Sequence, residues 1–508
     1  MTNIFSSKTN GTACIPILIE TQISQGIGIH LVGLADSEVK QSLLRTVTAL
    51  QSQGYSIPGK RIIINLAPAD LCKSGSGYDL PIALGLIAES GQETLPDLDH
   101  WIVLGELGLD GSVRYVPGCL QAMLYAKQTG LKGCIVPEAA LEELRPFSDG
   151  INAYAVSHLM EAIDIISERM DKPTIWNTPA KEDKPEPAEP DCWKSLQGNI
   201  GALRAIEIAA AGNHNILFFG APGSQKSSLA RALHALLPPI TEEQATESAL
   251  IYSASGKQGT VIRTRPFRAP HISCSLSAML GGGTGDRVMP GEVSLAHNGV
   301  LFLDDITDAP KAFVEALRAP MEDRQITISR LRSKTVFPAS FLLVASTNPC
   351  PCGYYGEGDR CTCTPGQRTA YLSRLSGPTY DHIAMQVFTH VPKTQETNAA
   401  PISFEEVRER VLKAREIQKK RFAGKPYNTN DKIPIKELET WCRLDEDGKD
   451  LLERLISQLG LSARAYTRIL RIARTIADLE GSETVLPQYL AEAASYRFLD
   501  RQIMNASI

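Results

Sequence analysis

The chain has 508 residues, of which 43% are hydrophobic and 21% are charged, and its formal net charge is −5. This length exceeds one ordinary hydrophobic core and predicts two to four domains. No apolar run approaches the roughly 18 residues that a membrane-spanning helix requires, and the N-terminus lacks the pattern of a secretory signal. We therefore expect a cytoplasmic protein without membrane contact, in which any nucleic-acid contact is local because the chain is not basic throughout.

An α/β domain is predicted over residues 1–171. Runs rich in β-branched residues (IPILIE, GIGIHLVGL, RIIINLA and WIVLGELGL) alternate there with helix-like stretches such as DSEVKQSLLRTVTALQSQ and DLPIALGLIAES. Residues 172–191 are rich in Pro, Lys and Glu and predict a solvated linker.

A second α/β domain is predicted over residues 192–395. Its apolar runs NILFFG, GVLFLDD and FLLVAST are short and continuous, as the strands of a mostly parallel buried sheet are. Beyond a polar segment the periodicity becomes helical, in SFEEVRERVLKAREIQKKRF, LLERLISQLG and SARAYTRILRIARTIADLEG, and predicts a small helical domain over 396–508. The fold class is therefore α/β multidomain with a helical C-terminal part.

A phosphate-binding loop is predicted where NILFFG leads through GAPGSQKSS into the helical LARALHALL. In such a loop backbone N–H groups surround a phosphate, a lysine neutralises it and a hydroxyl ligates Mg²⁺, roles that Lys226 and Ser227 fit. Gln225 stands where glycine is usual, at a position that takes dihedrals costly for larger residues. The predicted ATP-contacting residues are Gly220, Ala221, Pro222, Gly223, Ser224, Gln225, Lys226, Ser227 and Ser228. The alternative is a turn that binds nothing.

Two acids follow the strand-like GVLFLDD, about 80 residues after the loop. Asp304 is predicted to hold Mg²⁺ together with Ser227, and Asp305 to polarise the attacking water. Asp305 is one methylene shorter than the glutamate usual there, and this shortening would slow hydrolysis without abolishing binding. Asn348, after FLLVAST, is a candidate for sensing the γ-phosphate or orienting the water. The alternatives are an acidic turn at a strand end and a turn-forming Asn before Pro.

Several segments resemble the YifB/ComM group of magnesium-chelatase-like AAA+ proteins. They are RPFRAPH (265–271), SAMLGGG (277–283), PGEVSLAHNGVLFLD (290–304), NPCPCGYYG (348–356) and RLSGP (374–378). The resemblance implies an N-terminal domain similar to the Lon protease domain, with its S5-like α/β fold, an AAA+ P-loop core and a C-terminal helical lid. It also implies a homo-oligomeric ring, expected to be a hexamer, that binds ATP and Mg²⁺ between neighbours and moves or remodels DNA.

The chain departs from the family pattern after RLSGP. His382 stands where the resemblance places an arginine finger, and Ala384 stands where it places an aspartate. Loss of such an arginine would be serious, since it contributes 10³–10⁵ in rate. Arg374 remains a candidate to act on the neighbouring subunit, and Arg464 matches the family's sensor arginine, although an arginine on an amphipathic helix is by default a solvated residue.

Protease activity is not expected, although the N-terminal domain resembles that of Lon. The positions aligned with the nucleophilic Ser and its activating Lys are Gly77 and Leu120. Ser76 and Lys73 lie nearby in the sequence and are expected to be solvated turn residues.

Two basic strips are candidates for DNA contact in the pore of a ring: Arg263, Arg265 and Arg268, and then Arg330, Arg332 and Lys334 at a predicted hairpin tip. The alternative for each is a solvated charged hairpin. Cys350, Cys352, Cys361 and Cys363 form two CxC pairs and are candidates for a Zn²⁺ site, with a redox disulfide pair or free thiols as alternatives.

The leading hypothesis is an ATP-binding AAA+ ring that acts on DNA as a translocase or branch-migration factor. A non-hydrolysing paralogue with a scaffolding or regulatory role is the second, because Gln225, Asp305 and His382 all bear on hydrolysis. A motor subunit of a metal chelatase is the third. Whether the chain is an ATPase is left open.

Overall fold

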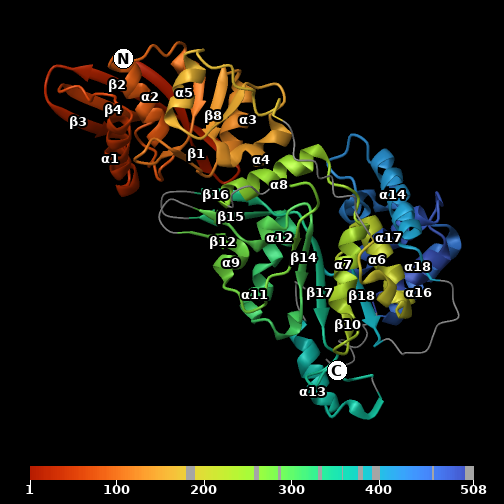
Figure 1. The fold of residues 1–508 in the computed structure, drawn as a ribbon. Helices are drawn as coiled ribbons and strands as arrows, with labels where there is room; N and C mark the ends of the chain where they lie inside the picture. The colour runs from red at the N-terminus through yellow and green to blue at the C-terminus, as the bar shows by residue number, and fades with distance from the viewer. Residues whose placement is uncertain are drawn as a thin grey trace.

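The computed structural model describes residues 1–178, 189–256, 262–283, 288–329, 334–356, 358–375, 382–391, 401–459 and 463–497. Figure 1 shows an N-terminal α/β unit, a central sheet with helices on both faces and a helical C-terminal part. The predicted α/β multidomain fold with a parallel-sheet core and a helical C-terminus is confirmed. No helix among the described residues is long and apolar enough to cross a membrane.

The N-terminal unit is built on a seven-stranded mixed sheet in the order β3-β4-β2-β1-β5-β8-β9. Its strands are β1 (Thr2–Asn10), β2 (Ala13–Ser24), β3 (Gly28–Val32), β4 (Arg61–Ala67), β5 (Trp101–Val103), β8 (Gly133–Pro137) and β9 (Ala153–Val156), and a separate ribbon pairs β6 (Glu106–Leu107) with β7 (Val113–Arg114). The helices are α1 (Ser37–Ser52), α2 (Asp79–Glu89), α3 (Cys119–Thr129), α4 (Leu141–Leu144) and α5 (Leu159–Ile166). Strand β1, which pairs antiparallel with β2, is missing from the sequence prediction because TNIFSSKTN is largely polar.

The central sheet has five parallel strands in the order β11-β14-β17-β10-β18. They are β10 (Ile216–Gly220), β11 (Phe267–Arg268), β14 (Val300–Leu303), β17 (Leu342–Thr347) and β18 (Met385–Thr389). Along β10 alternate side chains enter two different apolar clusters: Ile216 and Phe218 pack on one face of the sheet, and Leu217 and Phe219 on the other. Both faces are therefore buried, which explains the continuous apolar runs in the sequence.

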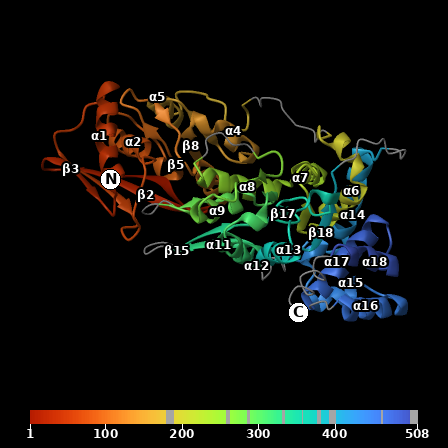
Figure 2. The ribbon, with the colours of Figure 1, turned by 90° about the horizontal axis from the view of Figure 1, so that it is seen from below.

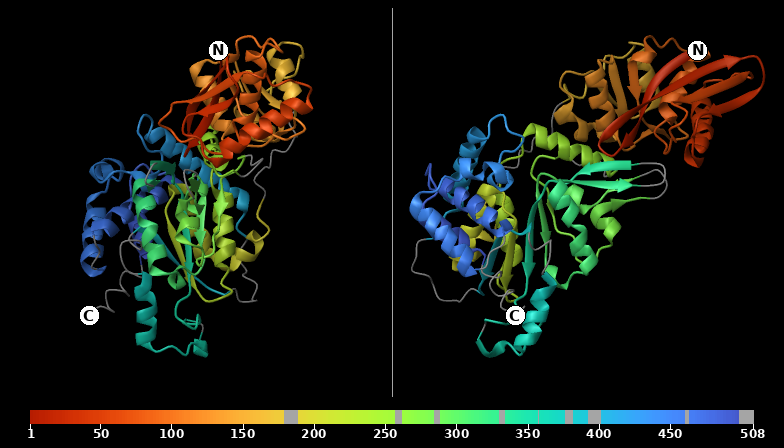
Figure 3. Two further views of the ribbon diagram at one scale, coloured as in Figure 1. Left: turned by 90° about the vertical axis from the view of Figure 1, so that its left-hand side faces the viewer. Right: turned by 180° about the vertical axis from the view of Figure 1, so that it is seen from behind.

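Helices cover both faces of this sheet. Those of the central unit are α6 (Ile200–Gly212), α7 (Lys226–Leu236), α8 (Glu242–Ala254), α9 (Leu276–Leu280), α10 (Glu292–Leu295), α11 (Lys311–Ala316), α12 (Arg318–Asp323) and α13 (Pro365–Leu372). Strands β15 (Gln325–Ser329) and β16 (Lys334–Pro338) form the antiparallel hairpin that the sequence predicts, and β12 (Gly281–Gly282) pairs with β13 (Met289–Pro290). In the views of Figures 1 and 3, α13 projects from the end of the unit opposite the N-terminal sheet.

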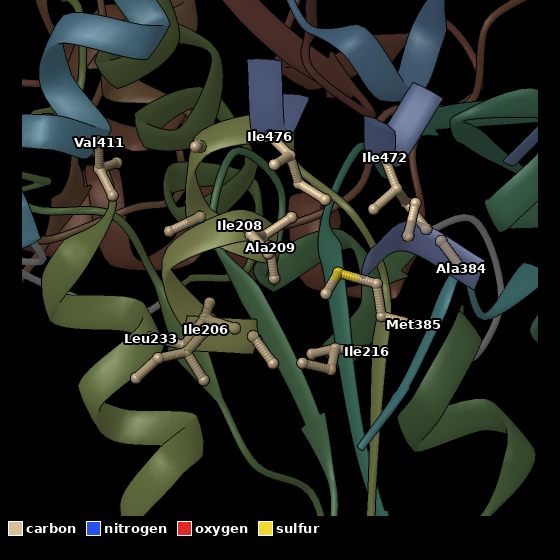
Figure 4. Packing of buried hydrophobic residues seen from close by; sticks show 14 of the residues in the cluster. Ile206, Ile208, Ala209, Ile216, Leu233, Ala384, Met385, Val411, Ile472 and Ile476 are labelled. Carbon is tan, nitrogen blue, oxygen red and sulfur yellow. The ribbon is translucent and has the colours of Figure 1, made fainter. Parts of the chain in front are cut away.

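The C-terminal helices share one hydrophobic core with the central sheet. They are α14 (Phe404–Arg421), α15 (Leu438–Trp441), α16 (Glu446–Leu459), α17 (Ala463–Leu479) and α18 (Pro487–Ser495). Figure 4 shows Val411 of α14 and Ile472 and Ile476 of α17 gathered over α6 and the strand residues Ile216 and Met385. A displacement of the C-terminal helices is thus transmitted to α6 and to the strands beneath it.

Among the described residues, the N-terminal unit contacts the central unit along α8 and at the β15–β16 hairpin (Figure 2). Gln121 Nε2 of α3 donates to the carbonyl oxygen of Leu250 in α8 at 2.8 Å, beside a small apolar contact between these helices. Thr335 Oγ1 of the β15–β16 hairpin donates to Asn10 Oδ1 at 2.7 Å. The hairpin is therefore held at its β16 side against the turn between β1 and β2.

A buried histidine in the turn between α6 and β10 contacts α17. His214 is 1% exposed, and its Nε2 lies 2.7 Å from Thr475 Oγ1. Burial lowers the pKa of His214 to about 4, so the ring stays neutral in the folded protein where an exposed histidine would take up a proton.

The contact through His214 makes the protein sensitive to acid. Between pH 6.5 and pH 4, His214 is protonated in the unfolded chain but stays neutral in the folded protein. The free energy of unfolding therefore falls as the pH falls. We expect a loss of about 2 kcal/mol between pH 7.5 and pH 5 from this group, measured by urea unfolding. The variant His214→Gln should show a shallower pH dependence, whereas the exposed-site control His30→Gln should not. An unchanged slope in His214→Gln would contradict this assignment.

Candidate functional site

The predicted phosphate loop lies at the carboxyl ends of neighbouring parallel strands. β10 ends at Gly220 and α7 begins at Lys226, while Asp304 and Asn348 directly follow β14 and β17. After β10 the chain runs to the far edge at β11, returns through β14 and β17, and then passes β10 to reach β18. Such a reversal of strand order opens the crevice in which α/β sheets bind ligands.

The loop backbone is left-handed at two positions. Gly223 has φ +84°, which glycine adopts without strain, and Gln225 has φ +64° and ψ +25°. The prediction that the residue before Lys226 has a backbone conformation unfavourable for side-chain-bearing residues is thus confirmed. Left-handed backbone costs a side-chain-bearing residue about 1–2 kcal/mol. Gln225 Oε1 is also buried and has no hydrogen-bond partner among the described residues.

The ammonium group of Lys226 is buried behind the loop. Its Nζ donates to the carbonyl oxygen of Gly220 at 2.7 Å and to Asn348 Oδ1 at 3.1 Å. Burial lowers the pKa of Lys226, and the carboxylates of Asp305 and Asp304 oppose this shift. A buried cation whose direct partners are neutral oxygens is poorly compensated, and an arriving phosphate would supply the missing negative charge.

Ser227 and Asp304 come together as a magnesium site requires. Ser227 Oγ lies 3.4 Å from Asp304 Oδ2, and the hydroxyl of Ser346 donates to the other carboxylate oxygen of Asp304. Hydroxyl and carboxylate oxygens beside a phosphate loop are the ligands that Mg²⁺ takes when it binds a nucleotide. The residues present therefore fit this ion.

Asp305 and Asn348 form a hydrogen-bonded pair beside Lys226. Asn348 Nδ2 donates to Asp305 Oδ1 at 3.0 Å, and the backbone N–H of Asp305 donates to Ser346 Oγ at 3.0 Å. Burial raises the pKa of Asp305, and the neighbouring charge of Asp304 raises it further. A carboxylate with a raised pKa is a better proton acceptor, as a general base requires.

Sequence reasoning missed two residues of this site. Ser346 holds both acids, and Thr389, the last residue of β18, lies 2.8 Å from Ser224 through its Oγ1. A Cβ on Gly220 would come within 2.2 Å of the same Thr389 oxygen, so this position in the loop requires glycine. The only available signal was a hydroxyl residue at or near the end of an apolar strand.

His382 is held within its own chain. Its Nε2 lies 3.2 Å from Glu322 Oε1, and the side chain is 18% exposed. Burial lowers the pKa of His382, the positive charges of Arg468 and Arg464 lower it further, and the opposing effect of Glu322 does not offset this lowering. The ring is therefore neutral near pH 7 and does not supply the cation of an arginine finger.

The two remaining catalytic candidates are exposed. Arg374 is 63% exposed in its side chain, and its Nη1 lies 3.8 Å from Asp308 Oδ1. Arg464, in the first turn of α17, lies close enough to His382 to influence its pKa. Their roles toward a neighbouring subunit stay predictions.

Two arginines of the first basic strip, Arg265 and Arg268, make contacts within the chain. Arg265 donates to the carbonyl oxygens of Pro238 at 2.6 Å and Asn298 at 2.7 Å, and Arg268 forms a two-fold ion pair with Glu292 at 2.6 and 2.7 Å. Both guanidinium groups are thus bound by groups of the chain itself, which leaves fewer of their N–H groups for phosphate. Their contact with DNA stays a prediction.

Of the other residues predicted to contact DNA, the structure describes two, Arg263 and Lys334. Arg263 is exposed, and Lys334 is exposed at the start of β16, opposite Ser329. Arg330 and Arg332 lie outside the described residues, in the segment of the sequence between β15 and β16. Their contact with DNA stays a prediction.

The two positions aligned with the Lon serine and lysine carry neither a nucleophile nor a base. Gly77 has no side chain, and Leu120 is fully buried in an apolar cluster. The prediction that Lys73 is solvated is wrong: the residue is fully buried, and its ammonium group donates to the carbonyl oxygen of Pro68. Ser76 donates a hydrogen bond from its hydroxyl to a carboxylate oxygen of Glu106.

The four cysteines at positions 350, 352, 361 and 363 meet in one cluster. Their sulfur atoms all lie within 4.8 Å of one another. The backbone N–H of Tyr354 lowers the pKa of Cys352 to about 6. The residues predicted for a metal site are therefore brought together, and the group can hold a metal ion.

Comparison with known proteins shows which class of protein this chain belongs to. Family models match almost the whole chain: "Subunit ChlI of Mg-chelatase" over residues 19–140, "Magnesium chelatase, subunit ChlI" over 192–398 and "Magnesium chelatase, subunit ChlI C-terminal" over 402–497. The protein is thus of the magnesium-chelatase ChlI class. It belongs, more narrowly, to the YifB/ComM family, as the predicted resemblance implied.

The relatives that support this assignment match over nearly their full lengths. The chain is 39% identical over 501 residues to the uncharacterized protein YifB of Escherichia coli, covering 97% of this chain and 96% of the relative. It is 39% identical over 518 residues to the competence protein ComM of Haemophilus influenzae, covering 99% of both chains. A shorter match, 25% identical over 173 residues and covering 31% of each chain, is to Lon protease 2 of Bacillus subtilis.

The left-handed backbone at position 225 gives a stability prediction. Gln225→Gly should raise the free energy of unfolding by about 1 kcal/mol, because glycine takes this conformation without strain. The matched variant Gln225→Ala removes the buried amide but keeps the strain, and it should give no such gain. Chemical unfolding measures both. An equal gain in the two variants would mean that the buried amide, rather than the backbone, carries the cost.

Proposed function

We propose that this protein binds ATP together with Mg²⁺ at the loop Gly220–Ser228 and, as a homo-oligomeric AAA+ ring, acts on DNA. One observation carries the proposal. Lys226, Ser227, Asp304, Asp305 and Asn348 come from separate segments of the sequence, and they meet in one hydrogen-bonded group at the carboxyl ends of β10, β14 and β17.

The chemistry of each side chain supports a role in this site. Lys226 supplies the buried positive charge for phosphate, and Ser227 and Asp304 supply oxygen ligands for the ion. The bound magnesium ion neutralises phosphate charge. Asp305 is placed to accept a proton from water, and Asn348 holds that carboxylate and contacts Lys226.

Hydrolysis is expected to be slow. Gln225 strains the loop, Asp305 has a shorter reach than glutamate, and His382 is a neutral ring bound to Glu322 where the family resemblance implies an arginine finger. These observations favour a second candidate function, a non-hydrolysing protein in which ATP stabilises assembly. A chelatase motor, which the family name suggests, has less support because the chain matches YifB and ComM over nearly its whole length.

DNA contact is proposed for the tip of the β15–β16 hairpin. Arg265 and Arg268 are engaged within the chain, so the basic candidates that favour this tip are Arg330, Arg332 and Lys334, with Arg263 elsewhere. Cations at such a tip bind phosphates without reading sequence, as a ring that moves along DNA requires.

Restoring the family pattern tests the catalytic part of the proposal. Wild-type protein should turn ATP over slowly, and the combined variant Gln225→Gly, Asp305→Glu and His382→Arg should be faster by roughly 10² or more, because an arginine finger alone contributes 10³–10⁵. Phosphate release measures turnover, and the same variant with Lys226→Ala controls for contaminating ATPases. Brisk wild-type turnover would overturn the expectation of slow hydrolysis.

Charge removal at the hairpin tip tests the DNA part. Arg330→Ala combined with Arg332→Ala should weaken DNA binding and lower the slope of log K against log salt concentration by about 1.4–1.8, the contribution of two phosphate contacts. The pair Arg443→Ala and Arg454→Ala removes the same charge from exposed positions on the C-terminal part and serves as the control. Equal DNA affinity in wild type and the tip variant would refute the assignment of the tip.

A further inference from the structure

The sulfur atoms of Cys350, Cys352 and Cys361 stand at the separations of a tetrahedral metal site. The Cys350–Cys352 sulfur distance is 3.3 Å, the Cys350–Cys361 distance is 3.8 Å and the Cys352–Cys361 distance is 3.7 Å. Zinc–thiolate bonds of about 2.3 Å give a tetrahedron whose edges are about 3.8 Å. With Cys363 also within 4.8 Å of the other three, a single ion can reach all four sulfur atoms.

The arrangement disfavours the other chemistries of clustered cysteines. A disulfide would draw the four sulfur atoms into two pairs at about 2.05 Å, whereas Cys350 is nearly equidistant from Cys352 and Cys361. An iron–sulfur cluster distributes its cysteines over two or four iron atoms, which spreads the sulfur atoms apart. Four thiolates around one centre are the ligand set that selects zinc over the hard cations Mg²⁺ and Ca²⁺.

The described residues between Cys350 and Cys363 have little apolar burial of their own. Cys350 is buried, but Tyr354 is 36% exposed and Tyr355 is 39% exposed. Their rings are covered by arginines instead, with the guanidinium of Arg368 4.1 Å from the Tyr355 ring centre. This segment, which we call the cysteine arm (residues 349–375), ends in the projecting helix α13 (Figures 1 and 3). A segment of this kind gains order from a metal ion that it could not gain from a core.

The cysteine arm touches the phosphate loop. A Cβ on Gly353 would lie 2.9 Å from Pro222 Cδ, so the two backbones pass as closely as glycine allows. Gly353 also has φ +85°, where other residues are strained. Asn348, which contacts Lys226 and Asp305, lies only two residues before Cys350. The position of the cysteine cluster is therefore coupled to the loop through a packing contact and through the chain.

We propose that Cys350, Cys352, Cys361 and Cys363 bind one Zn²⁺ ion as a closed structural site, and that this ion holds the cysteine arm against the phosphate loop. The ion orders the arm and fixes Gly353 beside Pro222 and Asn348 beside Lys226. The first part of the proposal stands by itself, and the second part, the effect on nucleotide, rests on the proposed function.

The metal site is tested on the full-length protein purified without chelators. Elemental analysis should find one zinc ion per chain in wild type and none in Cys361→Ser combined with Cys363→Ser. Cys274→Ser, which alters a half-buried cysteine outside the cluster, should keep the ion. Exchange of the wild-type metal for Co²⁺ should give the intense visible absorption of a tetrahedral thiolate site, a measurement that does not depend on the folding of a variant. Wild-type protein that carries no zinc and gives no such absorption, or that holds these cysteines in disulfides, overturns the proposal.

The coupling to the phosphate loop is tested with zinc content and nucleotide affinity measured on the same samples. Gly353→Ala should keep one zinc ion per chain but weaken MgATP binding roughly tenfold, an effect of about 1.4 kcal/mol, because its methyl group presses on Pro222. Removal of zinc by a chelator should weaken MgATP binding similarly. If both treatments leave the affinity unchanged, the coupling is refuted. If wild type holds zinc but binds no nucleotide at all, the proposed function fails and the metal site stands.

Discussion

The buried ammonium group of Lys226 is the interaction on which the candidate site depends. It links the end of β10, through the carbonyl oxygen of Gly220, to Asn348 after β17, and Asn348 links it to Asp305 after β14. These three strands lie side by side only because their alternating apolar side chains are buried on both faces of the sheet. The charge is held by neutral oxygens at a cost in desolvation, and the arrival of a phosphate group relieves that cost.

Much of this site could be predicted from the sequence because its parts are local. The strand, loop and helix around Lys226 and the acids after GVLFLDD are each readable over a dozen residues, and the parallel sheet follows from the length of the apolar runs. The left-handed backbone at Gln225 was also predictable, since the position normally holds glycine.

The parts that escaped prediction depend on contacts between distant segments. Arg265 and Arg268 read as free cations in the sequence, but the carbonyl oxygens and the Glu292 carboxylate that bind them are up to 33 residues away. Lys73 read as a solvated turn residue, yet the fold buries it. Ser346 and Thr389 carry no motif, and they gain a role only because β17 and β18 flank β10.

Gln225, Asp305 and His382 depart from the family pattern, and all three bear on ATP hydrolysis. Two further parts of the structure lie next to the phosphate loop. The C-terminal helices share the core beneath β10, and the cysteine arm packs against Pro222. A protein that retained the loop only as a remnant would have no need of the contacts that Lys226, Ser227 and Asp304 keep. We therefore interpret the site as one that holds a nucleotide and hydrolyses it poorly.

The most direct test is a calorimetric titration of the purified wild-type protein with ATP in the presence and absence of Mg²⁺. We expect saturable binding that is stronger with Mg²⁺. Lys226→Met should weaken this binding about tenfold or more, which corresponds to about 1.4 kcal/mol. The exposed-site control Lys194→Met should bind as wild type does. Absence of binding in wild type, or equal affinity in wild type and Lys226→Met, would contradict the account.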